Sequence, residues 1–439
     1  MNNNNFNKLP PSEVAGESLK ITHPLWQTFR SLKGNQRACV ITEPLWAIPN
    51  NLFLPFVSVY MAAVGLQDVQ IGMVASLGLA AQFLSGLFSG AIVDKYGRRK
   101  TMLVFGLLSW LLPCLLWAGA RGYWYFVFAV GLNGMWRITG NSFSCMIVED
   151  GDTGQLINIY TILNLFGLLA GFISPLAGLC IDRFTLVPTM RVIYLAAMVS
   201  MTIKFVLQYR MARESGMGLR RREECRGQSL FSLTFGGWSV FVSALRHTKL
   251  LLYVILMTLM TCFNIVQATF WPLFVTYSYG MSTSVLSVFP MVKAVTTLLV
   301  YVFITSHISM HSIRRPLLLG LGSQFLGLTV LLLCLPLGAA AIGAVFFSAI
   351  CEAFALAVLG PLSESMMSVT IPAKERARAN SLIAAMILLI SIPVGWIAGQ
   401  LSQQDRMLPL AMNICLLVAE VLMVLIITRK SNSRQKENV

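Results

Sequence analysis

Charged and amide side chains occur inside segments that are otherwise apolar enough to cross a membrane. Arg137 and Glu352 lie near the middle of two such segments, and Asn133 and Asn141 lie four residues before and after Arg137. Spacings of four residues place side chains on one face of a helix. A charge deep in a bilayer is costly, and it usually serves a solute or ion pathway. The pattern predicts a polar pathway, and ion pairs that only hold helices together are the alternative.

Two further apolar segments carry polar groups at helical spacing. Glu43 and Asn50 lie seven residues apart, and Asn264, Gln267 and Trp271 follow the spacing i, i+3, i+7. We predict that these side chains face the same pathway, with Glu43 nearer the cytoplasm as a candidate inner gate. Hydrogen bonds that only join neighbouring helices would produce the same amides.

Three more charges inside apolar segments are weaker candidates for the pathway. They are Lys204, Lys293 and Glu420.

The composition indicates which elements must position these residues. Apolar residues make up 56% of the 439 residues and charged residues only 12%, about half the roughly 25% of an ordinary globular domain. A helix needs about 20 mostly apolar residues to cross a bilayer, and the strict alternation of barrel strands is missing. We therefore expect an all-α membrane protein with 12 transmembrane helices. The predicted spans are 38–62, 69–93, 101–120, 122–148, 156–181, 190–208, 250–279, 284–306, 316–335, 338–366, 380–402 and 408–428.

The distribution of basic residues predicts the orientation. With both termini in the cytoplasm, 26 of the 33 Lys and Arg residues fall in cytoplasmic segments, and only a few fall in external loops. This asymmetry follows the positive-inside rule. The net charge of +15 is therefore interpreted as topology and contact with lipid headgroups in a multi-pass cell-membrane protein. No nucleic-acid partner is expected.

Matching positions recur at half the chain length. Trp26 and Trp238 are 212 residues apart, and the Arg98-Arg99 and Arg314-Arg315 pairs are 216 apart. The predicted organisation is two pseudo-symmetric six-helix halves. It comprises an N-terminal cytoplasmic segment with an interfacial helix (1–37), a first bundle (38–208), a linker with an amphipathic helix (209–249), a second bundle (250–428) and a cytoplasmic tail (429–439). Glu149 and Glu364 repeat at an offset of 215.

The repeat also relates the two central charges. Arg137 plus 215 is Glu352, so symmetry places them at matching depth in the two halves. We predict that they face one another across the pathway, where Glu352 could exchange protons.

The loop after the second span contains a specific motif. Residues 90–100 read Gly-Ala-Ile-Val-Asp-Lys-Tyr-Gly-Arg-Arg-Lys. Gly90 would allow close helix packing, Gly97 a tight turn, and Asp94 an ion pair with an arginine. This loop, through Gly90, Asp94, Gly97, Arg98 and Arg99, resembles the signature loop of the major facilitator superfamily.

The resemblance covers the whole chain. The segments at 43–46 and 148–150 look closest to uncharacterised bacterial members. The resemblance implies that Asp94, Arg98 and Arg99 latch the cytoplasmic ends of the two halves and release them during alternating access. The second copy, at 307–315, lacks the acid and the glycine, so the latch should be asymmetric.

We predict a secondary active transporter of a small solute, coupled to protons through Glu352 or Glu43, with a lean towards efflux. An ATP-driven pump is disfavoured, because no phosphate-binding G-x-x-x-x-G-K-[ST] loop occurs. We also expect a monomer without cofactor, metal or enzymatic activity. His307 and His311 have metal-ligand spacing but no third ligand beside them. The alternative is a non-transporting receptor or lipid-handling protein on the same fold. The sequence leaves the substrate, its direction and sodium coupling open.

Overall fold

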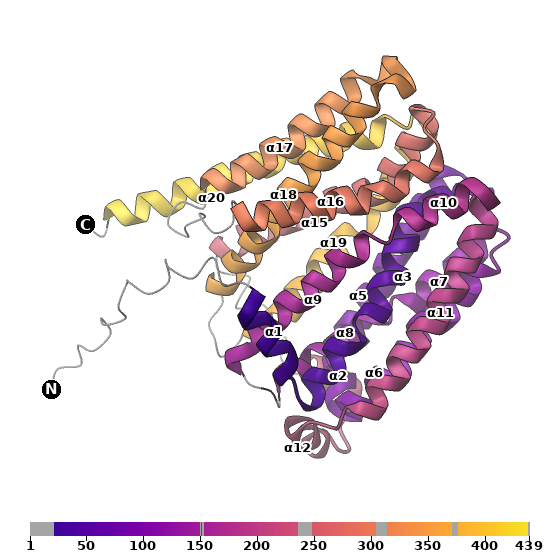
Figure 1. Ribbon diagram of the computed structural model, residues 1–439. Coiled ribbons are helices and arrows are strands. Elements are labelled where there is room, and N and C mark those ends of the chain that lie inside the picture. The colour runs from indigo at the N-terminus through magenta and orange to yellow at the C-terminus, as the bar shows by residue number, and fades with distance from the viewer. Residues whose placement is uncertain are drawn as a thin grey trace.

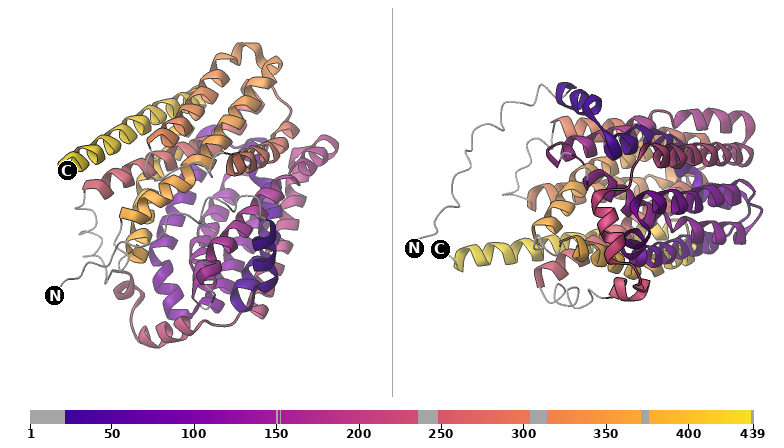
Figure 2. Two further views of the ribbon diagram at one scale, coloured as in Figure 1. Left: turned by 60° about the vertical axis from the view of Figure 1, so that its left-hand side comes forward. Right: turned by 90° about the horizontal axis from the view of Figure 1, so that it is seen from below.

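The computed structural model describes residues 22–149, 151, 153–235, 248–303, 314–370 and 376–437. The described residues form helices without strands, arranged as two bundles side by side (Figures 1 and 2). His307 and His311 lie outside the described residues, as does the interfacial segment around Trp238.

The first bundle and its flanking helices contain α1 (Thr22–Ser31), α2 (Gly34–Thr42), α3 (Pro44–Phe53), η1 (Leu54–Phe56), α4 (Val57–Ala63), α5 (Asp68–Tyr96), α6 (Arg98–Ala118), α7 (Tyr123–Asn133), α8 (Trp136–Val148), η2 (Thr153–Gln155), α9 (Leu156–Gly171), α10 (Pro175–Phe184) and α11 (Leu186–Met211). The linker contributes α12 (Gly216–Glu224) and α13 (Leu230–Phe235).

The second bundle contains α15 (Thr248–Leu273), the π-helical turn η3 (Phe274–Ser278), η4 (Thr283–Ser287), α16 (Val288–Phe303), α17 (Arg314–Leu333), η7 (Leu335–Ala341), α18 (Ile342–Thr370), α19 (Arg376–Gln404) and α20 (Leu408–Glu437).

Eleven helices in the described part of the chain are long and apolar enough to span a membrane. The first runs over Gly34–Ala63 and so starts four residues before the predicted residue 38. Its pieces meet at Pro44 and near Pro55, where the missing N–H groups interrupt the helical hydrogen bonds.

The remaining predicted span, 122–148, is present as two shorter helices. Gly134 and Met135 separate α7 from α8, and the backbone there forms three-residue-turn bonds such as Met135 N to Leu132 O (3.2 Å). Gly134 packs directly on α5, because a Cβ at this position would lie 2.5 Å from the Cβ of Ala81. With this broken helix, the chain has the predicted arrangement of twelve spans.

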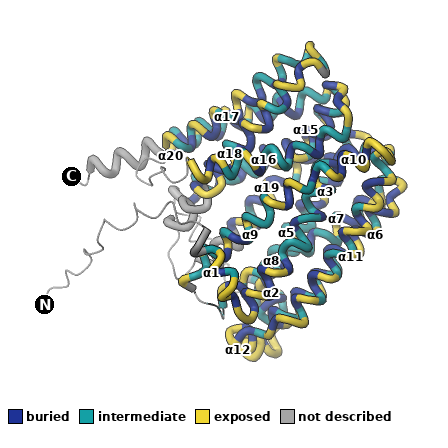
Figure 3. The backbone as a smooth tube through the Cα atoms, viewed as in Figure 1, coloured by how far each residue is buried: buried dark blue, intermediate teal, exposed yellow. Residues whose placement is uncertain are grey.

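Large apolar side chains remain exposed along the outer faces of both bundles. Trp124, Phe128 and Val192 are each more than 60% exposed, and exposed stretches follow the outer helices along their length (Figure 3). Soluble proteins rarely expose such extensive apolar surface to water. The surface matches a lipid environment, in which outward-facing residues contact acyl chains.

The halves contact each other at one end of the bundle. Asp68, at the start of α5, pairs with Arg406 (3.0 Å) and accepts a hydrogen bond from Ser402 (2.6 Å). The backbone of Trp396 in α19 donates to Ser76 in α5 (2.8 Å). We call this the Asp68 end. The Arg98 end lies at the other terminus of the 29-residue helix α5, roughly 43 Å away.

Candidate functional site

A cavity of about 420 Å³ lies between the two halves. The first half contributes Asn51, Leu54 and residues of α9 around Gly167, and the second half contributes residues of α15, η4, α16 and α18. Walls of this kind are mainly apolar with a few polar groups, as in small-molecule sites generally. The cavity is the candidate functional site.

An ion pair borders this cavity. Lys293 Nζ on α16 lies 2.6 Å from Glu352 Oε1 on α18. Gln267 on α15 donates from Nε2 to the other carboxylate oxygen (3.0 Å), and Asn413 on α20 donates to Gln267 Oε1 (3.2 Å). Both oxygens of Glu352 are therefore bound, and a chain of amides holds the carboxylate in place.

Aromatic side chains complete the polar edge of the cavity. The Trp271 ring stacks edge-on against Phe289, with centroids 4.7 Å apart, and Lys293 Nζ lies 5.8 Å from the Trp271 ring centroid. The indole Nε1–H of Trp271 is buried and has no hydrogen-bond partner among the described residues. A buried donor of this kind is costly unless something accepts from it, so the site can bind a solute with an acceptor oxygen.

The spacing-based prediction for α15 agrees with this geometry. Asn264, Gln267 and Trp271 all line the cavity together with Glu352. In the first span, the cavity residue is Asn51 and not the predicted Asn50. Asn51 Nδ2 donates to Ala47 O (2.9 Å) and to Gly167 O (3.4 Å). Prolines interrupt this helix, so regular helical spacing does not predict which side chain faces the cavity.

The predicted pair of Arg137 and Glu352 is absent from the described structure. Arg137 Nε bonds to Gln82 Oε1 (3.3 Å), and its guanidinium lies 4.6 Å from the Trp136 ring centroid. Glu352 pairs with Lys293 instead. The repeat relates positions in the two halves, but Arg137 faces α5 of its own half and Glu352 faces α16 of the other.

The rest of the predicted stripe on span 4 also faces neighbouring helices. Asn133 Nδ2 donates to Ser109 O (2.8 Å) on α6, and Asn141 Nδ2 approaches Ser89 Oγ (3.3 Å) on α5. The break at Gly134 puts Asn133 and Asn141 on separate helices. In this structure their bonds hold the first bundle together.

Glu43 forms a second buried ion pair, with Lys204 of α11 (2.8 Å). Only 5% of Lys204 is exposed, and its ammonium lies near the rings of Trp46 and Phe143. Neither partner lines the central cavity. Sequence reasoning noted Lys204 and Lys293 as intramembrane charges but did not predict their partners.

The signature loop forms a compact charged cluster at the Arg98 end. Arg98 is 3% exposed and pairs with both Asp94 (2.9 Å) and Glu149 (2.9 Å). Arg99 donates to Tyr209 O (2.8 Å) and lies over the Tyr209 ring. All these partners belong to the first bundle, so in this structure the loop does not join the two halves through any described residue.

Two glycines of the loop behave differently. Gly97 has φ +87°, the left-handed turn conformation that suits glycine, and its Cβ would lie 2.8 Å from Glu214 Oε2. Gly90 does not have the predicted packing role, because a Cβ there would meet nothing within 4 Å.

The linker contacts this cluster through a residue that sequence reasoning did not select. Glu214 accepts hydrogen bonds from the backbone N–H groups of Arg98 (2.6 Å) and Arg99 (3.0 Å), and so caps the first turn of α6. Ser215 donates to Glu149. Glu214 is one of three acidic residues in a mainly basic linker, and its charge was the available signal.

Twelve membrane spans in two bundles, with a mainly apolar cavity between them that a lysine–glutamate pair borders, are the architecture expected of a membrane transporter. The sequence profile of the Major Facilitator Superfamily matches residues 46–395. The chain therefore belongs to the major facilitator superfamily, and it is a membrane transporter rather than an enzyme.

Curated relatives match over a short stretch. The probable 3-phenylpropionic acid transporter of Escherichia coli is 36% identical over 83 residues, which is 19% of this chain and 22% of that protein. An uncharacterized MFS-type transporter of Bacillus subtilis, YqjV, is 31% identical over 86 residues, 19% of this chain and 21% of that protein. Each match spans about a fifth of the relative's length.

Solved structures share the whole fold at low identity. The nucleoside transporter NupG has a TM-score of 0.68 at 12% identity, covering 90% of this chain and 99% of that one. The xylose transporter XylE from E. coli has a TM-score of 0.65 at 15% identity, covering 89% and 94%. At these identities the likeness establishes the fold alone.

Proposed function

We propose that the protein is a proton-coupled secondary transporter whose solute is a small organic anion with an apolar body. The observation that carries this proposal is the Lys293–Glu352 pair at the edge of the inter-half cavity. The apolar walls suit a hydrocarbon or aromatic body, and Lys293 suits a carboxylate. The name of the E. coli relative, a probable 3-phenylpropionic acid transporter, is consistent with this chemistry.

The ion pair supplies a coupling mechanism. While Glu352 is ionised, it pairs with the Lys293 ammonium. An anionic solute would have to compete with Glu352 for this ammonium. A proton added to Glu352 neutralises the carboxylate and frees the ammonium to bind the solute carboxylate. Proton and anion therefore bind together, which favours co-transport down an inward proton gradient. The alternative is efflux, the direction that the sequence analysis favours.

The inter-half contacts suggest which state of the cycle this is. The basic residues of the chain concentrate at the Arg98 end, which the positive-inside rule assigns to the cytoplasm. The Asp68 end, where the halves contact, is then external. The described conformation corresponds to a transporter closed to the outside, and one chain supplies the complete cavity, so the proposed working unit is a monomer in the cell membrane.

Proteoliposome flux tests the proposal. Wild type and Glu352→Gln would be supplied with 3-phenylpropionate and other aromatic acids, and internal pH and solute uptake would be recorded. We expect solute-dependent proton entry in the wild type, and at least a tenfold loss in the variant. Glu223→Gln, an exposed linker position, is the matched control and should transport normally.

The outcomes discriminate between the alternatives. Solute exchange with protons moving in the opposite direction would establish export. Binding of the acid to wild type without flux or counterflow would support the receptor alternative and overturn transport. Uptake that ignores the proton gradient, in wild type and variant alike, would overturn proton coupling.

A further inference from the structure

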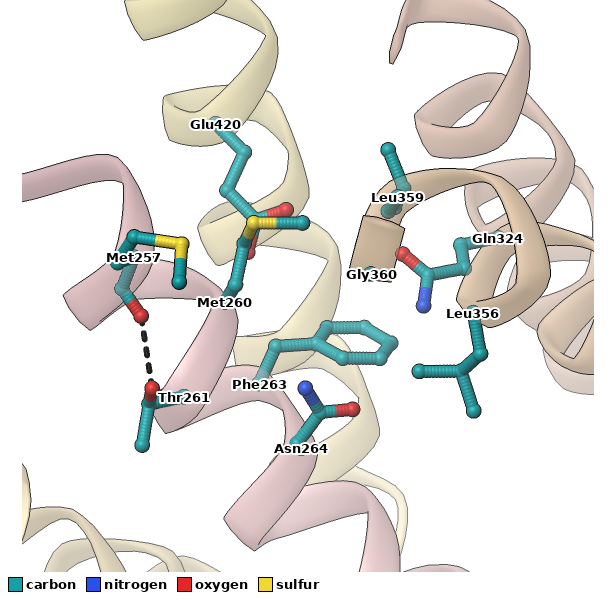
Figure 4. Close-up of a pocket in the computed structure, with 10 residues that line it drawn as sticks. All are labelled: Met257, Met260, Thr261, Phe263, Asn264, Gln324, Leu356, Leu359, Gly360 and Glu420. Atoms are coloured by element: carbon teal, nitrogen blue, oxygen red, sulfur yellow. Dashed lines mark hydrogen bonds between the residues drawn. The ribbon is translucent and has the colours of Figure 1, made fainter. Parts of the chain in front are cut away.

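A second, smaller cavity is lined by residues of the second half alone. Its volume is about 160 Å³, and α15, α17, α18 and α20 surround it. Figure 4 shows the side chains that line it, with Glu420 of α20 reaching in beside Met260 and Phe263. The transport mechanism above does not use this carboxyl group.

Glu420 is buried without the partners that a carboxylate needs. The residue is 1% exposed, and its Oε1 atom has no hydrogen-bond partner in the described part of the chain. Within the described residues it forms no ion pair, in contrast to Glu43 and Glu352. A buried carboxylate without a cation or hydrogen-bond donors carries a large desolvation penalty, which a bound proton removes.

No described residue around the pocket forms an ion pair with Glu420 or donates a hydrogen bond to it, and most of the lining is apolar. Met257, Met260, Phe263 and Leu359 are apolar, and the Thr261 hydroxyl donates to Met257 O (2.7 Å), as the dashed line in Figure 4 marks. The polar side chains in the pocket are the neutral amides of Asn264 and Gln324.

Titratable neighbours do not change this balance. On α15 the nearby titratable group is the Cys262 thiol, whose sulfur lies 3.5 Å from Ser391 Oγ of α19. The described pocket residues of α17 and α18 are uncharged. The side chains of Glu364, Arg376 and Arg378 lie outside the described residues.

The small pocket adjoins the central cavity. Asn264 and Leu356 line both spaces. Asn413, seven residues before Glu420 on the same face of α20, bonds to Gln267, which in turn holds Glu352. The pocket that holds Glu420 and the central cavity are therefore neighbouring spaces that share part of their lining.

We infer that Glu420 is a second proton-binding site, a neutral carboxylic acid stored in the side pocket of the second half in this conformation. Its carboxylate binds one proton, with no other bond made or broken, and returns it when the pocket is hydrated in another state of the cycle. Its coupling role rests on the proposed function, whereas its protonation does not. Two sites, Glu352 and Glu420, would then load per cycle.

Infrared difference spectroscopy tests the protonation directly. The full-length protein in lipid at neutral pH would be compared with Glu420→Gln. We expect the wild type to show the C=O stretch of a protonated carboxyl in apolar surroundings, and the variant to lose it. Glu352→Gln is the matched control, and it should instead lose carboxylate bands. Loss of carboxylate bands in Glu420→Gln would overturn the inference.

Folding and coupling are measured separately. Glu420→Leu, which fills the pocket without a polar group, should fold and should also lack the C=O band. In flux assays Glu420→Gln should still transport solute, with a twofold fall in protons moved per solute; an unchanged ratio would overturn the coupling role. Should the wild type move no protons at all, the proposed function fails while the infrared result stands.

Discussion

Two lysine–glutamate pairs lie inside the described bundles, and only one borders the cavity. Glu43–Lys204 is enclosed in the first half at 2.8 Å, while Lys293–Glu352 at 2.6 Å faces the space between the halves. Removing one member of a buried pair leaves the other charge uncompensated. Comparing the two pairs can therefore distinguish a lysine–glutamate pair that only stabilises the fold from one that takes part in transport.

For the enclosed pair we predict a stability effect that a second mutation reverses. Lys204→Met should destabilise the protein by about 3 kcal/mol, because Glu43 then remains buried without a cation. The double variant Glu43→Gln/Lys204→Met should recover most of that loss. Unfolding in detergent, followed by circular dichroism, measures both. Equal instability of the single and double variants would contradict a pairing role.

For the cavity pair we predict that stability recovers and transport does not. Lys293→Met/Glu352→Gln removes both charges, so its melting temperature should approach that of the wild type. Solute-coupled proton flux should stay at the level of empty liposomes. A double variant that transports with normal coupling would show that this pair is structural, like the enclosed one.

The sequence located the charges inside the membrane segments but not their contacts. Charge inside apolar segments identified Glu43, Arg137 and Glu352, since each is costly in lipid. Partners could not be inferred, because Lys204 lies 161 residues from Glu43 and Lys293 lies 59 from Glu352 in the chain. Repeat symmetry relates equivalent positions, and it does not specify which neighbouring helix a side chain meets.

At the scale of elements, span 4 differs from a uniform helix. No proline interrupts residues 122–148, so a single span was predicted despite the polar residues within it. The break arises from tertiary packing, where Gly134 lets α5 approach at Ala81 and Gln82. A glycine in an apolar helix indicates close packing, but not that the helix hydrogen bonds change there.

The close approach gives a prediction with an internal control. Gly134→Ala places a Cβ 2.5 Å from the Cβ of Ala81, and overpacking of this kind costs about 1–3 kcal/mol. Gly131→Ala, one turn earlier, meets nothing within 4 Å and should be neutral or slightly stabilising. Thermal unfolding of both variants measures the difference. Equal stabilities would mean that α7 and α8 can shift to absorb the added methyl group.

At the scale of the molecule, the sequence predicted the fold and left the conformational state undetermined. Twelve apolar segments and the repeated loops specify the two six-helix halves. The latch implied by Asp94, Arg98 and Arg99 connects no described residue of the second half. Instead, Arg98 pairs with Asp94 and Glu149, and Arg99 donates to Tyr209 O, all within the first half. Several states share one sequence, so the one adopted depends on contacts between the halves.

Those contacts are closest where α5 meets α19. A Cβ on Gly72 would lie 2.2 Å from Gly395 O and 2.8 Å from Gly399 Cα, so this junction tolerates only glycine. Gly72→Val should prevent the Asp68 end from closing, even though the Asp68–Arg406 pair favours closure. The population should shift towards a state with that end apart.

Spin labels at Gln67 and Gln404, both exposed at this end, would measure the shift in a background with the native cysteines replaced. The distance distribution of Gly72→Val should move to longer values, and transport should fall because the protein cannot complete the cycle. Gly86→Val is the matched control on the same helix, since a Cβ there meets nothing within 4 Å. An unchanged distribution in Gly72→Val would mean that the α5–α19 junction does not control closure, and that the halves separate along another surface.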